Sequence, residues 1–288
     1  MDLPALLVDT AWLPRHLGDP ALRVFDCTTR LVPDPVHTFR AESARPDWER
    51  GHVPGAAYID LQGTLSDPAS GLRFTMPSAE RFAEAMSALG VDADSRVVLY
   101  SAKSNWWATR VWWMLRAFGF DRAAVLDGGW EKWTAEGRPV CTAPCAYSRG
   151  RFVARPRPLL LANKDEVLAA THAAEVAIVN ALTREQHTGE GGVHYGRPGH
   201  IPSSVNVPYL ELIDRETNTF RPPAQLRAVL ERAGVLSAGR VITYCGGGIA
   251  ATGVAFALAL LGRHDTAVYD GSLGEWCADP SMKMATGD

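Results

Sequence analysis

The residue best suited to chemistry in this sequence is Cys245, which follows a β-branched run and precedes three glycines. Residues 240–244 (RVITY) predict a buried strand, and residues 250–261 predict a helix. A glycine turn between a strand and a helix lets the backbone approach a ligand closely, and its successive N–H groups bind anions. The start of the helix adds partial positive charge at the same point. We therefore expect Cys245 to be a nucleophile whose thiolate the loop stabilises. The backbone groups expected to bind substrate belong to Gly246, Gly247, Gly248, Ile249 and Ala250.

Taken alone, this loop leaves a second interpretation open. A buried structural cysteine beside a glycine-rich turn without function has the same local sequence, because a lone glycine cluster is weak evidence. The rest of the chain has to decide between the two interpretations.

Three segments of the chain recur in the same order. RVVLYS (96–101) returns as RVITYC (240–245), GHVPG (51–55) returns as GHIPS (199–203), and DGGW (127–130) returns as DGS (270–272) followed by Trp276. Recurrence at a nearly constant spacing is the signature of a duplicated unit. We therefore expect two copies of one domain, at residues 1–140 and 158–288, with a linker at residues 141–157.

Within each copy, short β-branched runs alternate with longer helical patterns. In the second copy, residues 176–180, 204–208, 240–244 and 266–270 predict strands, and residues 222–233 and 250–261 predict helices. Alternation of this kind builds an α/β domain with a mainly parallel sheet flanked by helices. Ligands in such sheets bind beyond the carboxyl ends of the strands, which is where Cys245 lies.

The three motifs together resemble the rhodanese superfamily, specifically its tandem-domain sulfurtransferases. The resemblance covers almost the whole chain, with the GH(V/I)P segments, the strand that ends in Cys-Gly-x-Gly and the DGS segment in the family's order. It implies two rhodanese-like domains, of which the C-terminal one is catalytic and carries a persulfide on its cysteine. Ser101 takes the place of Cys245 in the N-terminal copy, and a hydroxyl cannot carry sulfane sulfur. The N-terminal copy is therefore expected to be non-catalytic.

Phosphatases with a related loop are the nearest competing chemistry. Their loop is Cys-x5-Arg, because an arginine clamps the phosphate. Here Ala251 occupies that arginine position, and the next arginine is Arg263. The sequence therefore argues against a phosphatase.

The loop also bears on the sulfur donor. The resemblance implies basic residues after the cysteine in enzymes that prefer thiosulfate, and Cys-Gly-(Ser/Thr)-Gly-Val-Thr in those that prefer 3-mercaptopyruvate. Gly246 and Gly248 match the second pattern and no charge follows Cys245, whereas Gly247 and Ala250 depart from it by lacking hydroxyls. We expect 3-mercaptopyruvate to be preferred over thiosulfate.

A keto-acid donor needs a cation for its carboxylate. Arg184 and Arg197 are the arginines available between the first strand of the catalytic copy and the GHIP segment, although Gln186 and Val193 stand at or near the positions where the family has arginines. Asp60 matches an aspartate that the family directs across the domain interface toward the cysteine. We expect it to move a proton during sulfur transfer.

The composition limits the partners and the compartment. The 288 residues carry 29 Lys and Arg against 32 Asp and Glu, a balance that argues against nucleic-acid binding. No apolar run is long enough for a bilayer, no secretory signal is indicated, and five scattered cysteines favour a reducing cytoplasm. We expect no metal or organic cofactor, and a thiol, cyanide or thioredoxin as sulfur acceptor. The alternative is a non-catalytic rhodanese-fold module that binds a partner or senses oxidants through Cys245.

Overall fold

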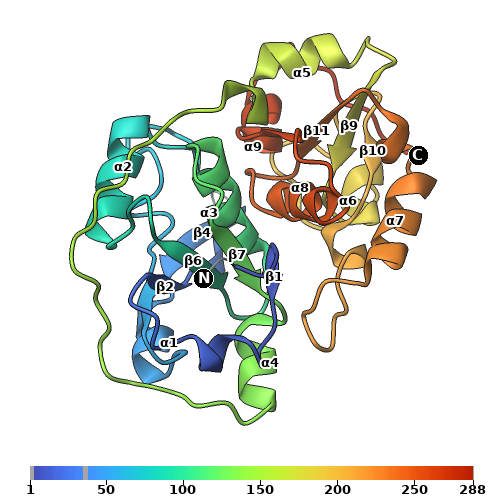
Figure 1. Cartoon of the computed structure of the whole chain (residues 1–288). Helices are drawn as coiled ribbons and strands as arrows, with labels where there is room; N and C mark the ends of the chain where they lie inside the picture. Colours follow the sequence, from blue (N-terminus) through green and yellow to red (C-terminus); the bar gives the residue numbers. More distant parts are fainter. Residues whose placement is uncertain (1–2, 35–37, 288) are drawn as a thin grey trace.

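Two parallel sheets of five strands, one in each half of the chain, form the framework of the computed structural model (Figure 1). The structure describes residues 3–34 and 38–287. β-branched and other apolar residues fill the strands, and most strand residues are buried because helices cover the sheets. The predicted α/β class with mainly parallel sheets is confirmed.

The N-terminal sheet has the strand order β1-β7-β6-β2-β5, with every pairing parallel. Its strands are β1 (Leu7–Val8), β2 (Leu22–Asp26), β5 (Ala56–Tyr58), β6 (Arg96–Tyr100) and β7 (Ala123–Leu126). The helices of this half are α1 (Arg45–Arg50), α2 (Ala79–Ala88), α3 (Trp106–Ala117) and α4 (Gly129–Ala135).

The C-terminal sheet has the strand order β10-β9-β11-β12-β8, again with every pairing parallel. Its strands are β8 (Leu161–Ala162), β9 (Val176–Asn180), β10 (Val205–Asn206), β11 (Arg240–Tyr244) and β12 (Ala267–Tyr269). The helices of this half are α5 (Lys164–Ala170), α6 (Arg184–Thr188), α7 (Pro223–Arg232), α8 (Ala250–Leu260) and α9 (Ser272–Ala278).

The two halves have the same topology. Read in reverse, the C-terminal order matches the N-terminal one strand for strand, so that β11 corresponds to β6 and β12 to β7. Cys245 follows β11 as Ser101 follows β6. The structure therefore confirms the duplication that the recurring segments predicted.

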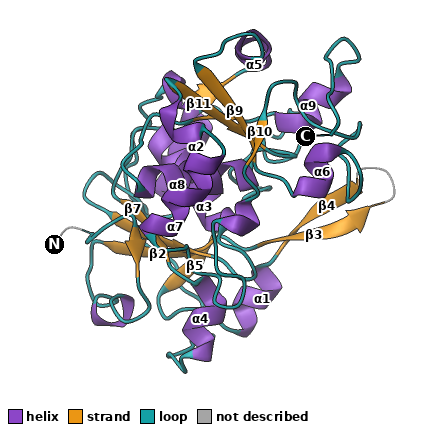
Figure 2. Cartoon of the chain, turned by 90° about the vertical axis from the view of Figure 1, so that its right-hand side faces the viewer, coloured by secondary structure: helices purple, strands orange, loops and turns teal. Residues whose placement is uncertain are grey.

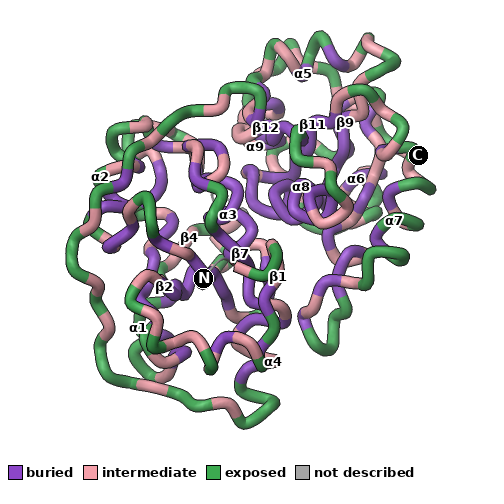
Figure 3. Tube along the Cα trace, viewed as in Figure 1, coloured by how far each residue is buried: buried purple, intermediate pink, exposed green. Residues whose placement is uncertain are grey.

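Helices α3 and α8 pack against each other where the two halves meet (Figures 1 and 2). Trp112 of α3 meets Phe256 of α8 edge to face, with ring centroids 4.7 Å apart, and the hydroxyls of Thr109 and Thr252 lie 3.0 Å apart. Helix α8 is apolar on all faces and buried along almost its whole length (Figure 3). The interface thus places the start of α8, and with it Cys245, against the N-terminal half.

Two further segments connect the halves. The antiparallel hairpin of β3 (Thr29–Asp34) and β4 (Thr38–Ser43) extends from the N-terminal half toward α6 and α9 (Figure 2). The proposed linker, residues 141–157, follows the surface of the N-terminal half, where the Tyr147 hydroxyl donates to the Gly55 carbonyl over 2.6 Å and Phe152 is buried. The hairpin, unlike the linker, forms part of the candidate site.

Candidate active site

Cys245 lies directly beyond the carboxyl end of β11, and four residues separate it from the first residue of α8. Ser272, at the start of α9, holds this turn in shape. Its hydroxyl accepts from the N–H groups of Cys245 and Gly248, each over 3.1 Å, and donates to the Tyr269 carbonyl over 2.8 Å. The serine of the DGS segment therefore has a definite role, which is to fix the catalytic loop.

Gly248 is the glycine that the turn requires. It has a φ of +74°, and a Cβ at this position would lie 2.8 Å from the Asp270 carbonyl oxygen. Both the backbone conformation and the space exclude a side chain.

The N–H groups of Gly246, Gly247 and Ile249 have no acceptor among the described residues. They precede α8, whose N-terminal end carries partial positive charge. The loop thus leaves three N–H groups available to an anion, whereas Ser272 already occupies the Gly248 N–H.

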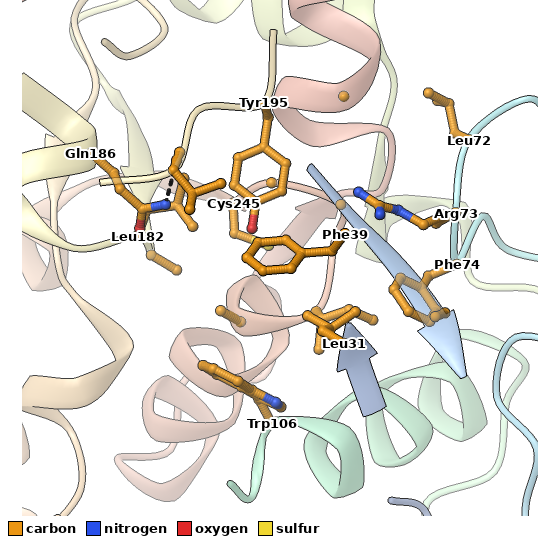
Figure 4. A pocket seen from close by; sticks show the side chains of 18 of the residues that line it. Leu31, Phe39, Leu72, Arg73, Phe74, Trp106, Leu182, Gln186, Tyr195 and Cys245 are labelled. Atoms are coloured by element: carbon orange, nitrogen blue, oxygen red, sulfur yellow. Dashed lines mark hydrogen bonds between the residues drawn. The ribbon is translucent and has the colours of Figure 1, made fainter. Parts of the chain in front are cut away.

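A cavity of about 930 Å³ opens onto this loop (Figure 4). Its walls come from both halves of the chain and are mostly apolar. They include Leu31 and Phe39 from the β3–β4 hairpin, Leu72, Arg73, Phe74 and Trp106 from the N-terminal half, and Leu182, Gln186, Val193, Tyr195 and Cys245 from the C-terminal half. The volume is within the range of pockets that hold small organic ligands.

Tyr195 covers the loop beside the cysteine. Its ring packs so closely on Gly246 that a Cβ at residue 246 would overlap it. Burial and the neighbouring Cys245 raise the pKa of the Tyr195 phenol to about 12, which keeps this hydroxyl protonated at neutral pH. It is therefore a hydrogen-bond donor next to the sulfur.

Residues 71–74 form part of the cavity wall that comes from the N-terminal half, and the segment around them is tied to the C-terminal half. Arg110, fully buried on α3, donates to the carbonyl oxygens of Phe74 (2.5 Å) and Gly248 (3.2 Å). It also forms an ion pair of 2.7 Å with Asp270, whose carboxylate accepts from the Met76 N–H over 2.7 Å. One buried arginine thus holds the catalytic loop and the opposite wall in register.

The two arginines expected from the sequence do not line this cavity. The Arg197 guanidinium donates to the carbonyl oxygens of Trp276, Asp279 and Met282 over distances of 2.7–3.2 Å, and so it organises the chain after α9. Arg184 is the first residue of α6 and is exposed. Gln186 and Val193 do line the cavity, where the Gln186 side-chain amide donates to the Val193 carbonyl over 2.7 Å.

Asp60 is likewise absent from the cavity wall. Its carboxylate accepts from the Gly63 N–H over 2.9 Å and caps the turn that follows β5. The structure thus shows Asp60 capping its own turn, and the described residues that line the cavity do not include it.

Tyr195 and Arg73 line the cavity, and the sequence analysis did not identify them. Both belong to irregular segments without a motif, far from Cys245 along the chain. The tyrosine in HYG (194–196) and the arginine in GLRF (71–74) carry no periodic signal that would have singled them out.

Ser101, the counterpart of Cys245, is fully buried and donates its hydroxyl proton to the Ser104 carbonyl over 2.7 Å. The hydroxyl of Ser101 thus stabilises its own loop.

The fold and the site together are those of a two-domain protein that places a cysteine loop at the interface of a duplicated α/β unit. The rhodanese-like domain family matches residues 9–136 and 163–279, so the chain belongs to the rhodanese family.

Relatives over nearly the whole chain bear two names. The chain is 31% identical to the mouse protein "Thiosulfate sulfurtransferase", with 98% of this chain and 95% of that protein covered. It is 32% identical to "3-mercaptopyruvate sulfurtransferase" of Escherichia coli K12, with 96% of each covered. The crystal structure of SseA from Escherichia coli, described as a 3-mercaptopyruvate sulfotransferase, superposes with a TM-score of 0.81 at 30% identity and covers 93% of this chain and 98% of its own.

Proposed function

We propose that this protein is a sulfurtransferase in which Cys245 carries a persulfide between a sulfur donor and a thiophilic acceptor. The observation that carries the proposal is the position of Cys245, at the base of a cavity and on a loop whose N–H groups have no acceptor among the described residues. The relatives named as sulfurtransferases support the same reaction.

In the first half-reaction, the Cys245 thiolate attacks the thiol sulfur of 3-mercaptopyruvate and forms the S–S bond. The C–S bond breaks, its electron pair passes to the methylene carbon, and the proton of the donor thiol ends on that carbon to give pyruvate. In the second half-reaction, the acceptor attacks the outer sulfur and the S–S electron pair returns to Cys245. The persulfide anion replaces the thiolate in the field of the same N–H groups, so one loop serves both steps.

The preference for 3-mercaptopyruvate over thiosulfate is part of the proposal. The loop Cys245–Ala250 contains no basic side chain, and thiosulfate would meet only backbone dipoles there. A compact dianion such as thiosulfate depends on charged side chains in the loop for strong binding. A keto acid is longer and can also bind residues of the cavity beyond the loop.

The acceptors we propose are cyanide, small thiols and thioredoxin, and the compartment is the cytoplasm. Cys245 lines the cavity, and the five cysteines are all free, which fits a reducing compartment. Among residues 3–34 and 38–287, no helix has the length and apolar composition needed to span a bilayer.

Steady-state turnover with each donor tests this proposal. The wild-type protein should consume 3-mercaptopyruvate over many cycles with cyanide or a thiol as acceptor, and with higher catalytic efficiency than thiosulfate. A single modification of Cys245 without turnover would instead indicate an oxidant sensor. A higher efficiency with thiosulfate would overturn the donor assignment and leave the sulfurtransferase assignment intact.

A further inference from the structure

We propose that Arg73, a residue of the non-catalytic half, binds the anionic group of the sulfur donor, and that this group is the carboxylate of a short α-keto acid. The inference rests on the proposed function, because it assigns a residue to the donor of that reaction. It identifies a substrate-binding cation that comes from the other half of the duplicated chain.

The first observation is an unpartnered charge. Arg73 lines the cavity, and its Nη1 is buried without a hydrogen-bond partner in the described part of the chain. A buried donor on a charged group is costly when it is left unsatisfied, and native structures seldom leave one without a reason. No described residue accepts a hydrogen bond from the Arg73 guanidinium, so its other N–H groups are available to an anion in the cavity.

The second observation is the direction of the side chain. Figure 4 shows the Arg73 guanidinium pointing into the cavity toward Tyr195, on the side of the cavity away from Gln186. The Tyr195 phenol lies in the electrostatic field of both Arg73 and Cys245. An anion held by Arg73 would therefore lie beside Tyr195 and within the space that opens onto the cysteine.

The third observation is that hydrogen bonds hold the backbone next to Arg73 in a strained conformation. Phe74 has a φ of +61°, a left-handed conformation that is strained for an aromatic residue. Its N–H donates to the Gln62 side chain over 3.0 Å and its carbonyl accepts from Arg110. Because these bonds hold Phe74 on both sides, the chain direction at Arg73 is defined relative to the catalytic loop.

The fourth observation is the absence of competing charges. No Asp or Glu is among the described residues that line the cavity, and its other arginine, Arg40, pairs with Glu42 over 2.6 Å. The surrounding walls are largely apolar, with Leu72 and Phe74 on either side of Arg73. A low local dielectric strengthens an ion pair formed there.

A carboxylate fits this cation better than a compact dianion does. The guanidinium is planar and donates two parallel hydrogen bonds to a carboxylate. In a short α-keto acid thiol, the carbon chain separates the carboxylate from the sulfur, which allows Arg73 and Cys245 to engage opposite ends of one molecule.

The test uses two alkylating reagents, so that its result does not depend on sulfur transfer. Iodoacetate carries a carboxylate and iodoacetamide is its neutral analogue, and both alkylate Cys245. In Arg73→Met, the rate with iodoacetate relative to iodoacetamide should fall about tenfold or more, as expected for the loss of a charge-assisted hydrogen bond. Arg73→Lys should recover part of the ratio, and Arg149→Met, which removes an exposed arginine that pairs with Glu84 outside the cavity, is the control with an unchanged ratio.

An unchanged ratio in Arg73→Met would overturn the assignment of Arg73. The iodoacetamide rate itself shows whether the variant keeps a native loop, and Arg73→Lys provides the comparison if Arg73→Met unfolds. A second experiment measures sulfur transfer by Arg73→Met and distinguishes a carboxylate from thiosulfate as the bound anion. Its catalytic efficiency should fall about 10- to 100-fold with 3-mercaptopyruvate and less with thiosulfate. An equal fall in catalytic efficiency with both donors would contradict the proposal that Arg73 binds a carboxylate. Failure of both donors to load Cys245 in the wild type would refute the proposed function, while the alkylation ratio would still decide the role of Arg73.

Discussion

Arg110 of α3 and Asp270, which follows β12, form an ion pair of 2.7 Å across the interface of the two halves. The arginine side chain is fully buried and the carboxylate nearly so, and each also binds backbone groups of the other half. The N-terminal half thus contributes a structural connection to the loop of Cys245.

Arg110→Met should destabilise the protein by about 3–5 kcal/mol, because it leaves the Asp270 carboxylate buried without its partner. Urea denaturation monitored by tryptophan fluorescence measures this change in the free energy of unfolding. The exposed pair of Arg149 and Glu84 offers the control, since Arg149→Met should leave the unfolding midpoint nearly unchanged. Equal midpoints for Arg110→Met and the control would refute the role of the interface pair.

Two neighbouring glycines should respond differently to alanine. Gly248→Ala should cost about 1–3 kcal/mol of stability, because residue 248 has a left-handed backbone and a Cβ there would crowd the Asp270 carbonyl. Gly247→Ala meets nothing closer than 3.9 Å and should retain wild-type stability. Thermal unfolding of the two variants decides the matter, and a greater loss in Gly247→Ala would contradict the loop geometry.

Cys245 should be the cysteine that iodoacetamide labels first at neutral pH. Cys245 lies on a loop at the start of a helix, a type of position at which cysteines are reactive, and it lines the cavity that admits the reagent. Burial raises the pKa values of the Cys27 and Cys145 thiols, which slows their reaction. Peptide mapping after brief treatment reports the order, and faster labelling of Cys141 or Cys277 would count against an activated Cys245.

Asp127 should make stability depend on pH. Its carboxylate accepts from the Phe220 N–H of the other half over 2.9 Å, and burial raises its pKa from 3.8 to about 6. The folded state therefore binds a proton that the unfolded state does not, and stability rises as the pH falls from about 6 toward 3.8. Asp127→Asn keeps an acceptor oxygen but cannot titrate. Denaturation curves at several pH values should show this gain in the wild type alone, and parallel curves for both proteins would disprove it.

The sequence predicted the fold and the nucleophile because both leave local patterns. The β-branched run before Cys245, the glycines after it and the duplicated segments define strand, loop and topology within short windows. The same comparison placed Ser101 opposite Cys245, and the structure confirms that the two residues follow corresponding strands.

The cations of the site could not be predicted in this way. Arg197 lies closer to the expected position along the chain than Arg73 does, yet its guanidinium satisfies carbonyl oxygens that the end of α9 leaves free. Arg73 reaches the cavity only because α3 packs on α8 and Arg110 fixes the segment around Phe74. Long-range packing decides which arginine lines the cavity, and no spacing in the sequence records it.

The most direct test of a persulfide on Cys245 is the intact mass of the protein after incubation with 3-mercaptopyruvate, and separately with thiosulfate, without an acceptor. We expect the wild type and Ser101→Ala to gain the mass of one sulfur atom and to lose it again when cyanide is added, whereas Cys245→Ser gains nothing. A sulfur adduct that persists in Cys245→Ser, or a wild-type protein that gains no sulfur from either donor, would contradict the account.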